Sequence, residues 1–258
     1  MFFKNLLGVI MNFTSRILFT VFVFLTSLMD LEATPHKIAL CITATGKYNT
    51  LANSLITSGR NFFLKNHEVT YFVFGDTQII DGNDIKKIHV NKLNWPLDSL
   101  MRFKFYLDHK DALENYDYIY AIDADMLFVS DIGDEILSDL VGTIHPGFYN
   151  SIGTYERSRN STAYVSGNEG KIYFAGAFYG GKKDKFFHLL ETTTRNIAKD
   201  LSKNFIAIWH DESHLNRYFI DNPPSLLLNP SYCYPESSSI PFKRKILFLN
   251  KNHAQIRS

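Results

Sequence analysis

The stretch YDYIYAIDADMLFVSD, residues 116–131, places two aspartates, Asp123 and Asp125, between two apolar runs. Residues 116–122 are mostly apolar or aromatic, which is typical of a buried β-strand. Side chains two positions apart in a strand project to the same face, so the two carboxylates either point together or lie where the strand ends. Such close carboxylates repel each other, and burial increases the cost. The stretch therefore predicts a core strand leading to a site where a cation offsets this repulsion.

Strand-like and helix-like segments alternate on the N-terminal side of this stretch. The expected strands are residues 37–45, 69–76 and 85–90, with 116–122 as the fourth. The expected helices are residues 49–66 and 99–110, with Ser99 as a cap of the second, followed after a less regular region by 184–199 and a helix beginning near Trp209. This alternation predicts an α/β fold with one Rossmann-like, mainly parallel sheet flanked by helices on both faces.

Composition limits the classes of function. The chain has 258 residues, of which 45% are hydrophobic, enough for one sizeable domain. Its 27 basic and 26 acidic residues create no global field that would attract nucleic acid, so nucleic-acid binding is excluded. Cys41 and Cys233 lie far apart without a CxxC motif, which predicts two small buried hydrophobic residues rather than a zinc site or a disulfide.

The N-terminus has the charge and hydropathy order of a secretory signal. An uncharged apolar run, residues 17–29, follows Lys4 and Arg16. As a helix it spans about 20 Å, short of the bilayer core of about 30 Å. We expect residues 1–35 to be a signal peptide or short signal anchor, with the remaining chain outside the cytoplasm or in a lumen. An apolar helix docked on a cytosolic domain is the alternative. Asn160, in NST, would be a glycosylation acceptor on a eukaryotic secretory route.

The aspartate pair suits a hard divalent cation. Mg²⁺ and Mn²⁺ commonly bind one or two carboxylates together with phosphate oxygens of a substrate. In open parallel sheets, ligands gather beyond the carboxyl ends of the strands, where this pair falls. Two enzyme classes place a DxD motif at such a position: haloacid-dehalogenase-like phosphatases, usually on the first strand, and nucleotide-sugar transferases. The position on the fourth strand favours a transferase.

Longer motifs extend this interpretation. They are DADMLF (123–128), GTIHPGFY (142–149), AYVSGNEGKIYFAGAFYGG (163–181), WHDESHLNRYF (209–219) and KNH (251–253). In order and spacing the chain resembles glycosyltransferase family 6, which includes the histo-blood-group A and B transferases and the α1,3-galactosyltransferase. The resemblance spans roughly residues 37–256 and implies a GT-A fold in a catalytic domain over 36–258, with a mobile C-terminal tail.

The resemblance also implies a donor site. Asp123 and Asp125 match the ligands of the metal, Mn²⁺ or Mg²⁺, and of the donor diphosphate. Arg102 matches a nucleotide-binding arginine, whose guanidinium can grip a diphosphate bidentately. Further matches to nucleotide-binding positions are Ala44 and Tyr48 at the uracil pocket, although Thr43 and Thr45 depart from the family pattern, and also Trp95 and, in the tail, Lys251.

Glu212 matches the carboxylate that faces the anomeric carbon, either as a nucleophile or as an electrostatic stabiliser. Asp211 would bind hydroxyls of the donor sugar, and His145 and Trp209 would contact the acceptor. Ala175 and Ala177 match the donor-selecting positions. The small Ala175 leaves room for an acetamido group, which favours UDP-GalNAc slightly over UDP-Gal.

These matches together imply a retaining, metal-dependent hexosyltransferase. It would move GalNAc or Gal from a UDP-sugar to a galactoside glycan, with or without fucose, in α1,3 linkage. A catalytically inactive glycan-binding protein of the same fold and a DxD phosphohydrolase are the alternatives. The N-terminal segment predicts association with a membrane or export, with a cytoplasmic location as the alternative. The oligomeric state and the acceptor stay open.

Overall fold

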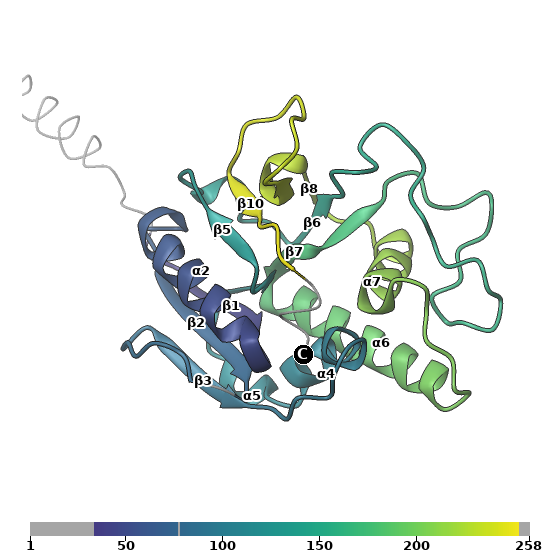
Figure 1. Ribbon diagram of the computed structural model, residues 1–258, viewed down its shortest axis with the longest axis horizontal. Coiled ribbons are helices and arrows are strands. Elements are labelled where there is room, and N and C mark those ends of the chain that lie inside the picture. Colours follow the sequence, from purple (N-terminus) through teal and green to yellow (C-terminus); the bar gives the residue numbers. More distant parts are fainter. Residues whose placement is uncertain (1–33, 77, 253–258) are drawn as a thin grey trace, which may run out of the picture. The chain divides into compact units, whose positions relative to one another are not determined.

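A seven-stranded sheet runs through residues 34–76 and 78–252, the part of the chain that the computed structural model describes (Figure 1). Its strand order is β3-β2-β1-β4-β7-β6-β8. The strands are β1 (Lys37–Thr43), β2 (Glu68–Gly75), β3 (Ile85–His89), β4 (Tyr118–Asp123), β6 (Leu140–Ile144), β7 (Phe174–Lys182) and β8 (Leu226–Leu228).

The sheet is mainly parallel, as expected. β1 pairs in parallel with β2 and with β4, and Thr43 is opposite Asp123 at their carboxyl ends. β2 and β3 are also parallel, as are β6 and β8. β7 is antiparallel to both of its neighbours, β4 and β6. This mixed α/β arrangement, a large mostly parallel sheet flanked by helices, is that of a GT-A-like fold.

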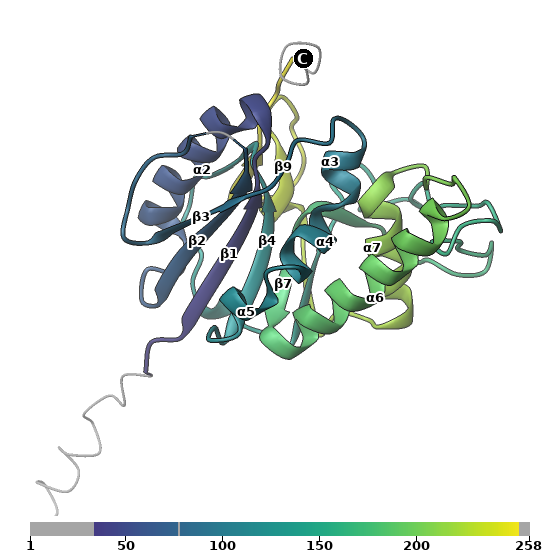
Figure 2. The same ribbon diagram turned by 90° about the horizontal axis from the view of Figure 1, so that it is seen from below.

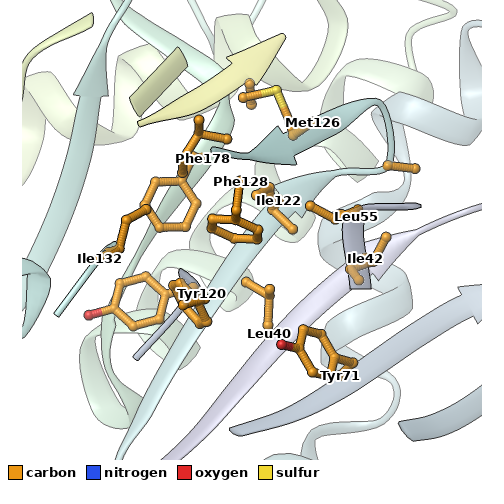
Figure 3. Close-up of a cluster of buried hydrophobic side chains, with 14 of the residues drawn as sticks. Leu40, Ile42, Leu55, Tyr71, Tyr120, Ile122, Met126, Phe128, Ile132 and Phe178 are labelled. Atoms are coloured by element: carbon orange, nitrogen blue, oxygen red, sulfur yellow. The ribbon is translucent and has the colours of Figure 1, made fainter. Parts of the chain in front are cut away.

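Helices cover both faces of this sheet (Figure 2). The helices are α2 (Asn49–Phe62), α3 (Leu97–Leu100), α4 (Arg102–Leu107), α5 (Lys110–Leu113), α6 (Lys183–Leu201) and α7 (His210–Asp221), with 3₁₀ turns η1 (Gly46–Tyr48), η2 (Asp134–Ile136) and η3 (Pro230–Cys233). Because successive strand residues face opposite sides, Leu40 and Ile42 pack with Leu55 of α2 in one core cluster, whereas Cys41 packs with Phe103 of α4 in another. Figure 3 shows the first cluster.

A small second sheet places the C-terminal segment beside the aspartate pair. It consists of β5 (Met126–Phe128), β10 (Ile246–Phe248) and β9 (Tyr234–Pro235). β10 runs antiparallel to β5, and Leu249 N donates a hydrogen bond to Asp125 O at 2.9 Å. Met126 and Phe128 are buried in the core, so the apolar residues after the aspartates return the chain to the interior (Figure 3).

Two helix predictions need correction. The expected helix over 99–110 is divided into α3, α4 and α5, because Met101 (φ −90°, ψ 2°) and His109 (φ −117°, ψ 27°) leave the α-helical region. Ser99 lies inside α3, whose N-cap residue is Pro96, so Ser99 does not cap the start of this helix. The helix expected over 49–66 ends at Phe62, because Phe63 is extended (φ −100°, ψ 114°) and forms a β-bridge with Ile132.

Other expectations are confirmed or stay untested. Cys41 and Cys233 are buried and unpaired, as expected. The chain divides between Pro35 and His36, but the apolar run at 17–29 lies outside the described residues, as does His253 of the KNH motif. In the part that the structure describes, no helix has both the length and the apolar character needed to cross a membrane.

Candidate active site

A cavity of about 590 Å³ lies at the carboxyl ends of β1 and β4. Its wall also includes residues of β7, the first turn of α7, β9, β10 and the segment after β10. Among the described lining residues, five carry carboxylates and three carry basic side chains, so acidic groups are in excess. The acids are Asp98, Asp123, Asp125, Asp211 and Glu212, and the bases are Lys92, Arg102 and Lys251.

The two aspartates of the DAD motif lie at the end of β4, as the sequence predicts. Asp123 is its last residue, and Asp125 lies in the turn that leads to β5. Each carboxylate contacts its own cation: Asp123 Oδ1 is 2.5 Å from Arg102 Nη1, and Asp125 Oδ2 forms an ion pair with Lys251 Nζ. The Asp125 side chain is only 2% exposed, so its charge depends on such a partner.

Arg102 joins three elements at the floor of the cavity. Its Nη1 donates to Asp123 and also to Gly176 O at 3.2 Å, and its Nε lies 3.1 Å from Asp211 Oδ2. Burial opposes the guanidinium charge, but the carboxylates of Asp123 and Asp211 outweigh it and raise the pKa of Arg102. Arg102 therefore stays charged and fixes β4, β7 and α7 relative to one another.

Lys251 reaches the site because β10 pairs with β5. Its Nζ contacts Asp125 and lies over the rings of Tyr48 and Phe248, 5.1 and 5.2 Å from their centroids. The side chain is 12% exposed. An ammonium group held this way contributes positive charge to the same end of the cavity as the aspartate pair.

Glu212 lies in the first turn of α7 and points at β7. Its Oε1 accepts a hydrogen bond from Tyr173 Oη at 2.9 Å, and its Oε2 accepts one from Gly176 N at 2.8 Å. Burial raises the pKa of Glu212 to about 7, although these two hydrogen bonds oppose the rise. Burial likewise raises the pKa of Asp211 to about 6, with Arg102 acting in the opposite direction. Both acids are thus poised near neutral pH, which is typical of functional carboxylates.

A buried asparagine fixes the distance between α7 and β7. Asn216 Oδ1 accepts a hydrogen bond from Phe174 N at 2.8 Å, and its Nδ2 donates to Phe174 O at 2.8 Å and to Glu212 O at 2.9 Å. This clamp keeps Glu212 against Gly176. Sequence reasoning missed both Asn216 and Tyr173. Tyr173 carried one available signal, because it directly precedes the small and apolar residues of β7, and a tyrosine buried there needs a polar partner for its hydroxyl.

Thr43, Thr45, Tyr48 and Lys92 form a further part of the cavity wall. Ala44 was expected here, but its side chain is fully buried and does not line the cavity. Neighbouring residues at the end of β1 alternate in direction, so the two threonines face the cavity and Ala44 faces the core. The structure therefore brings Tyr48 to the site but not the side chain of Ala44.

The predicted acceptor residues, His145 and Trp209, also line the cavity. His145 Nδ1 accepts a hydrogen bond from Gly147 N at 3.0 Å, and burial lowers the pKa of His145 to about 4. The ring is therefore neutral and carries its proton on Nε2. Trp209 is 46% exposed and Trp95 is 52% exposed, and both line the cavity. The Trp95 ring meets that of His210 edge to face, 5.1 Å between centroids.

Ala175 and Ala177 form part of the cavity wall on β7, beside Gly176. Both are nearly fully buried, with 2% and 6% of their surface exposed. A methyl group at each position leaves open the space that longer side chains would fill. The wall of β7 is therefore shaped by small residues, next to Glu212.

The cavity thus contains acids, cations and aromatic side chains from distant parts of the chain, as the motifs predict. The sequence model of glycosyltransferase family 6 matches residues 17–258. The chain belongs to glycosyltransferase family 6. It is 30% identical over 253 residues to globoside alpha-1,3-N-acetylgalactosaminyltransferase 1 of Gallus gallus, covering 91% of this chain and 74% of that protein.

Two further family 6 relatives come from different kinds of organism. Histo-blood group ABO system transferase 1 of Rattus norvegicus is 33% identical over 238 residues, covering 86% of this chain and 68% of that protein. O-antigen biosynthesis glycosyltransferase WbnI of Escherichia coli is 34% identical over 215 residues, covering 80% of this chain and 92% of that protein. These similarities support glycosyl transfer and a sugar donor and glycan acceptor as substrates.

Proposed function

We propose that this family 6 member is a retaining, metal-dependent hexosyltransferase that moves GalNAc or Gal from a UDP-sugar to a galactoside acceptor in α1,3 linkage. The observation that carries the proposal is the convergence of Asp123, Asp125, Arg102 and Glu212 in one cavity. An inactive glycan-binding protein would not need this combination of charged groups. Two relatives with names that state α1,3-N-acetylgalactosaminyl or ABO transfer support the linkage and the sugar class.

Asp123 and Asp125 fit a hard divalent ion such as Mn²⁺ or Mg²⁺. The described residues contain no cluster of three or more His, Cys, Asp or Glu side chains suited to a metal, so protein ligands alone would not complete a coordination shell. Two carboxylates completed by diphosphate oxygens and water are a common arrangement for Mg²⁺. The excess of acids in the cavity is consistent with a bound cation. When bound, the ion would stabilise the departing UDP as a Lewis acid.

Arg102 and Lys251 would bind the donor diphosphate from two sides. Arg102 is held by Asp123 and Asp211 at the floor, and Lys251 lies next to Asp125. Tyr48 and the two threonines at the end of β1 would line the uridine site. Lys251 follows β10 on a short segment, so binding of UDP would draw this segment over the nucleotide and exclude water.

Glu212 would face the anomeric carbon of the donor sugar. Retention requires either attack by this carboxylate or front-face departure and attack through an oxocarbenium-like transition state, which a carboxylate stabilises. The hydrogen bonds from Tyr173 and Gly176 fix both carboxylate oxygens and favour the charged form. Asp211, next to it, would bind hydroxyls of the sugar.

His145 and Trp209 would bind the acceptor. A neutral His145 offers its Nε2 proton to an acceptor hydroxyl, and the exposed indole of Trp209 offers an apolar face to a sugar ring. The small Ala175 leaves room for an acetamido group, so UDP-GalNAc is the slightly favoured donor over UDP-Gal. The N-terminal apolar run at 17–29 would place the enzyme in the secretory pathway or at a membrane.

Calorimetric titration with UDP, with and without Mn²⁺, followed by transfer from both donors on a glycan array, tests this proposal. Metal-coupled UDP binding together with transfer to galactosides is expected. UDP binding without turnover of either donor would identify a binding protein. Release of phosphate from small phosphomonoesters without UDP affinity would identify a phosphohydrolase. Either of these outcomes would contradict the proposal.

A further inference from the structure

Glu156 is a buried carboxylate that lies outside the cavity wall and joins two loops. It is 6% exposed. Its Oε1 accepts a hydrogen bond from Ser158 N at 2.7 Å, and its Oε2 accepts one from Ile208 N at 2.8 Å. Ile208 directly precedes Trp209, so the second bond holds the backbone that carries the exposed indole of the cavity.

The segment around Trp209 is fixed mainly through its backbone. His210 N donates to Ala207 O at 2.9 Å, which makes residues 207–210 a turn, and Trp209 N donates to Ser213 Oγ at 3.0 Å. The side chains of Ile208 and Trp209 are 51% and 46% exposed, so core packing does not hold them. Without the bond from Ile208 N to Glu156, the N-terminal half of this turn would lose a charge-assisted anchor.

Hydrogen bonds hold the loop that contains Glu156. Val165 N donates to Glu156 O at 2.9 Å, which closes the loop onto itself. Asp200, near the end of α6, accepts hydrogen bonds from Ser161 Oγ at 2.5 Å and from Thr162 N at 2.8 Å, and its side chain is 2% exposed. The loop from 156 to 165 is thereby attached to α6 by a second buried carboxylate. Through its bond from Ile208 N, Glu156 connects this loop to the turn before α7.

We propose that Glu156 is a positioning residue that sets the orientation of Trp209 and thereby the affinity for the acceptor sugar. The inference rests on the proposed function, in which Trp209 contacts the acceptor. Glu156 lies outside the cavity wall, and Arg102, Asp123 and Asp125, which would bind the donor diphosphate, lie on other elements. Trp209 O accepts hydrogen bonds from Glu212 N at 3.0 Å and from Ser213 N at 3.4 Å, so the same turn also begins α7. Removal of the Glu156 carboxylate should therefore weaken acceptor binding and leave UDP binding intact.

Two substitutions weaken the same bond from its two ends. Glu156→Gln leaves one accepting oxygen for the two donors Ser158 N and Ile208 N, so one of the two bonds is lost and the other loses its charge assistance. Ile208→Pro removes the N–H donor at the second position of a turn, where proline is favoured. In the full-length enzyme each should raise the acceptor KM about tenfold, the equivalent of one charge-assisted hydrogen bond of about 1.4 kcal/mol. The affinity for UDP in the presence of Mn²⁺, which depends on the residues that would hold the diphosphate, should stay unchanged.

Matched controls separate positioning from loop stability. Glu169→Gln alters another glutamate of the connection between β6 and β7, which accepts from Ser166 N at 2.9 Å and from Arg217 without contacting the turn. Ile208→Ala removes the exposed side chain and keeps the N–H. Both controls should leave the acceptor KM within twofold of wild type, allowing for the surface location of these groups. An effect of Glu169→Gln or Ile208→Ala equal to that of Ile208→Pro would overturn the inference.

A second readout does not depend on turnover. The chain contains two tryptophans, so Trp95→Phe leaves Trp209 as the sole indole fluorophore. In this background, Glu156→Gln and Ile208→Pro should change the emission maximum of Trp209 and increase its quenching by acrylamide, whereas Glu169→Gln should not. If wild type transfers to no acceptor, the proposed function fails while this measurement still tests positioning. An unchanged Trp209 spectrum in both variants would show that Glu156 does not position it. If Glu156→Gln lacks the folded circular dichroism spectrum, Ile208→Pro decides.

Discussion

Tyr173 Oη lies 2.9 Å from Glu212 Oε1, and this hydrogen bond connects the residue directly before β7 to the first turn of α7. Tyr173 is 1% exposed, so its hydroxyl has no access to bulk water. The bond stabilises the charged form of a carboxylate that burial otherwise disfavours. The orientation and the charge of Glu212 are thus set by a residue 39 positions away in the chain.

Removal of this hydroxyl should shift the pH dependence of transfer. In Tyr173→Phe, the pKa of Glu212 rises further because the hydrogen bond that lowers it is lost. The acidic limb of the kcat/KM profile should move to higher pH, and the rate at neutral pH should fall about tenfold to a hundredfold, as for a lost hydrogen bond to a charged group. Tyr155→Phe is the matched control, because the Tyr155 hydroxyl donates to Ile172 O. Identical profiles for Tyr173→Phe and wild type would contradict this role.

Glu212 should also reduce the stability of the folded protein at neutral pH. Its pKa rises from 4.5 to about 7 on folding, so the folded state binds the proton more tightly than the unfolded state. The free energy of unfolding therefore falls as pH rises through this range, and the loss is complete above about pH 7. Glu212→Gln should be more stable than wild type by about 3 kcal/mol at pH 8, and the difference should shrink toward pH 5. Thermal melts of both proteins across this range check it; a pH-independent difference would be evidence against the buried charge.

The Lys251–Asp125 ion pair predicts opposite effects on metal and nucleotide binding. Lys251→Met frees the buried Asp125 carboxylate from its ammonium partner, so Mn²⁺ alone should bind more tightly. UDP should bind about tenfold more weakly in the presence of Mn²⁺, because one cation that faces the diphosphate is lost. Calorimetry of both ligands measures this. Lys243→Met, at an exposed lysine that precedes β10, should change neither. Weaker Mn²⁺ binding in Lys251→Met would refute the competition.

Ala175 should control the choice of donor. Ala175→Met fills space beside Gly176, which disfavours an acetamido group more than a hydroxyl. The ratio of kcat/KM for UDP-GalNAc to that for UDP-Gal should fall about tenfold, within the range expected when a pocket loses room for a small group. Ala175→Ser adds one atom and should change the ratio little. Equal losses for both donors in Ala175→Met would mean that the methyl group of Ala175 does not face the C2 substituent.

The central strand β4 and the site of the aspartate pair could be predicted from the sequence. An apolar run predicts a buried strand, and two acids at its end predict a site where a cation offsets their repulsion. The apolar residues that predict β1 and β4 are consecutive in the sequence, so no distant contact is needed to recognise either strand. β7 could not be assigned from periodicity, because all of its residues up to Gly181 are buried and small residues give no alternating pattern. The break at Met101 is also invisible, since residues 99–110 have uninterrupted helical spacing.

Within the site, sequence motifs indicated which residues line the cavity, but not which hydrogen bonds those residues make. The cavity contains Arg102, Glu212, His145 and Lys251, which the motifs indicate. Tyr173 and Glu156 were missed because their contacts join segments 39 and 52 residues apart, a relation that no local pattern contains. Ala44 was placed at the cavity, but the strand alternation turns it into the core, and that orientation depends on the register of β1 between β2 and β4.

The most direct test of the central claim is transfer from labelled UDP-GalNAc and UDP-Gal to a galactoside acceptor, with Mn²⁺ and after chelation, by wild type and Asp125→Ala. We predict transfer by wild type that stops on chelation and returns with Mn²⁺. Asp125→Ala should remain folded by circular dichroism and show no Mn²⁺-dependent transfer. Equal transfer by wild type with and without metal, or metal-dependent transfer by Asp125→Ala at the wild-type rate, would contradict the account.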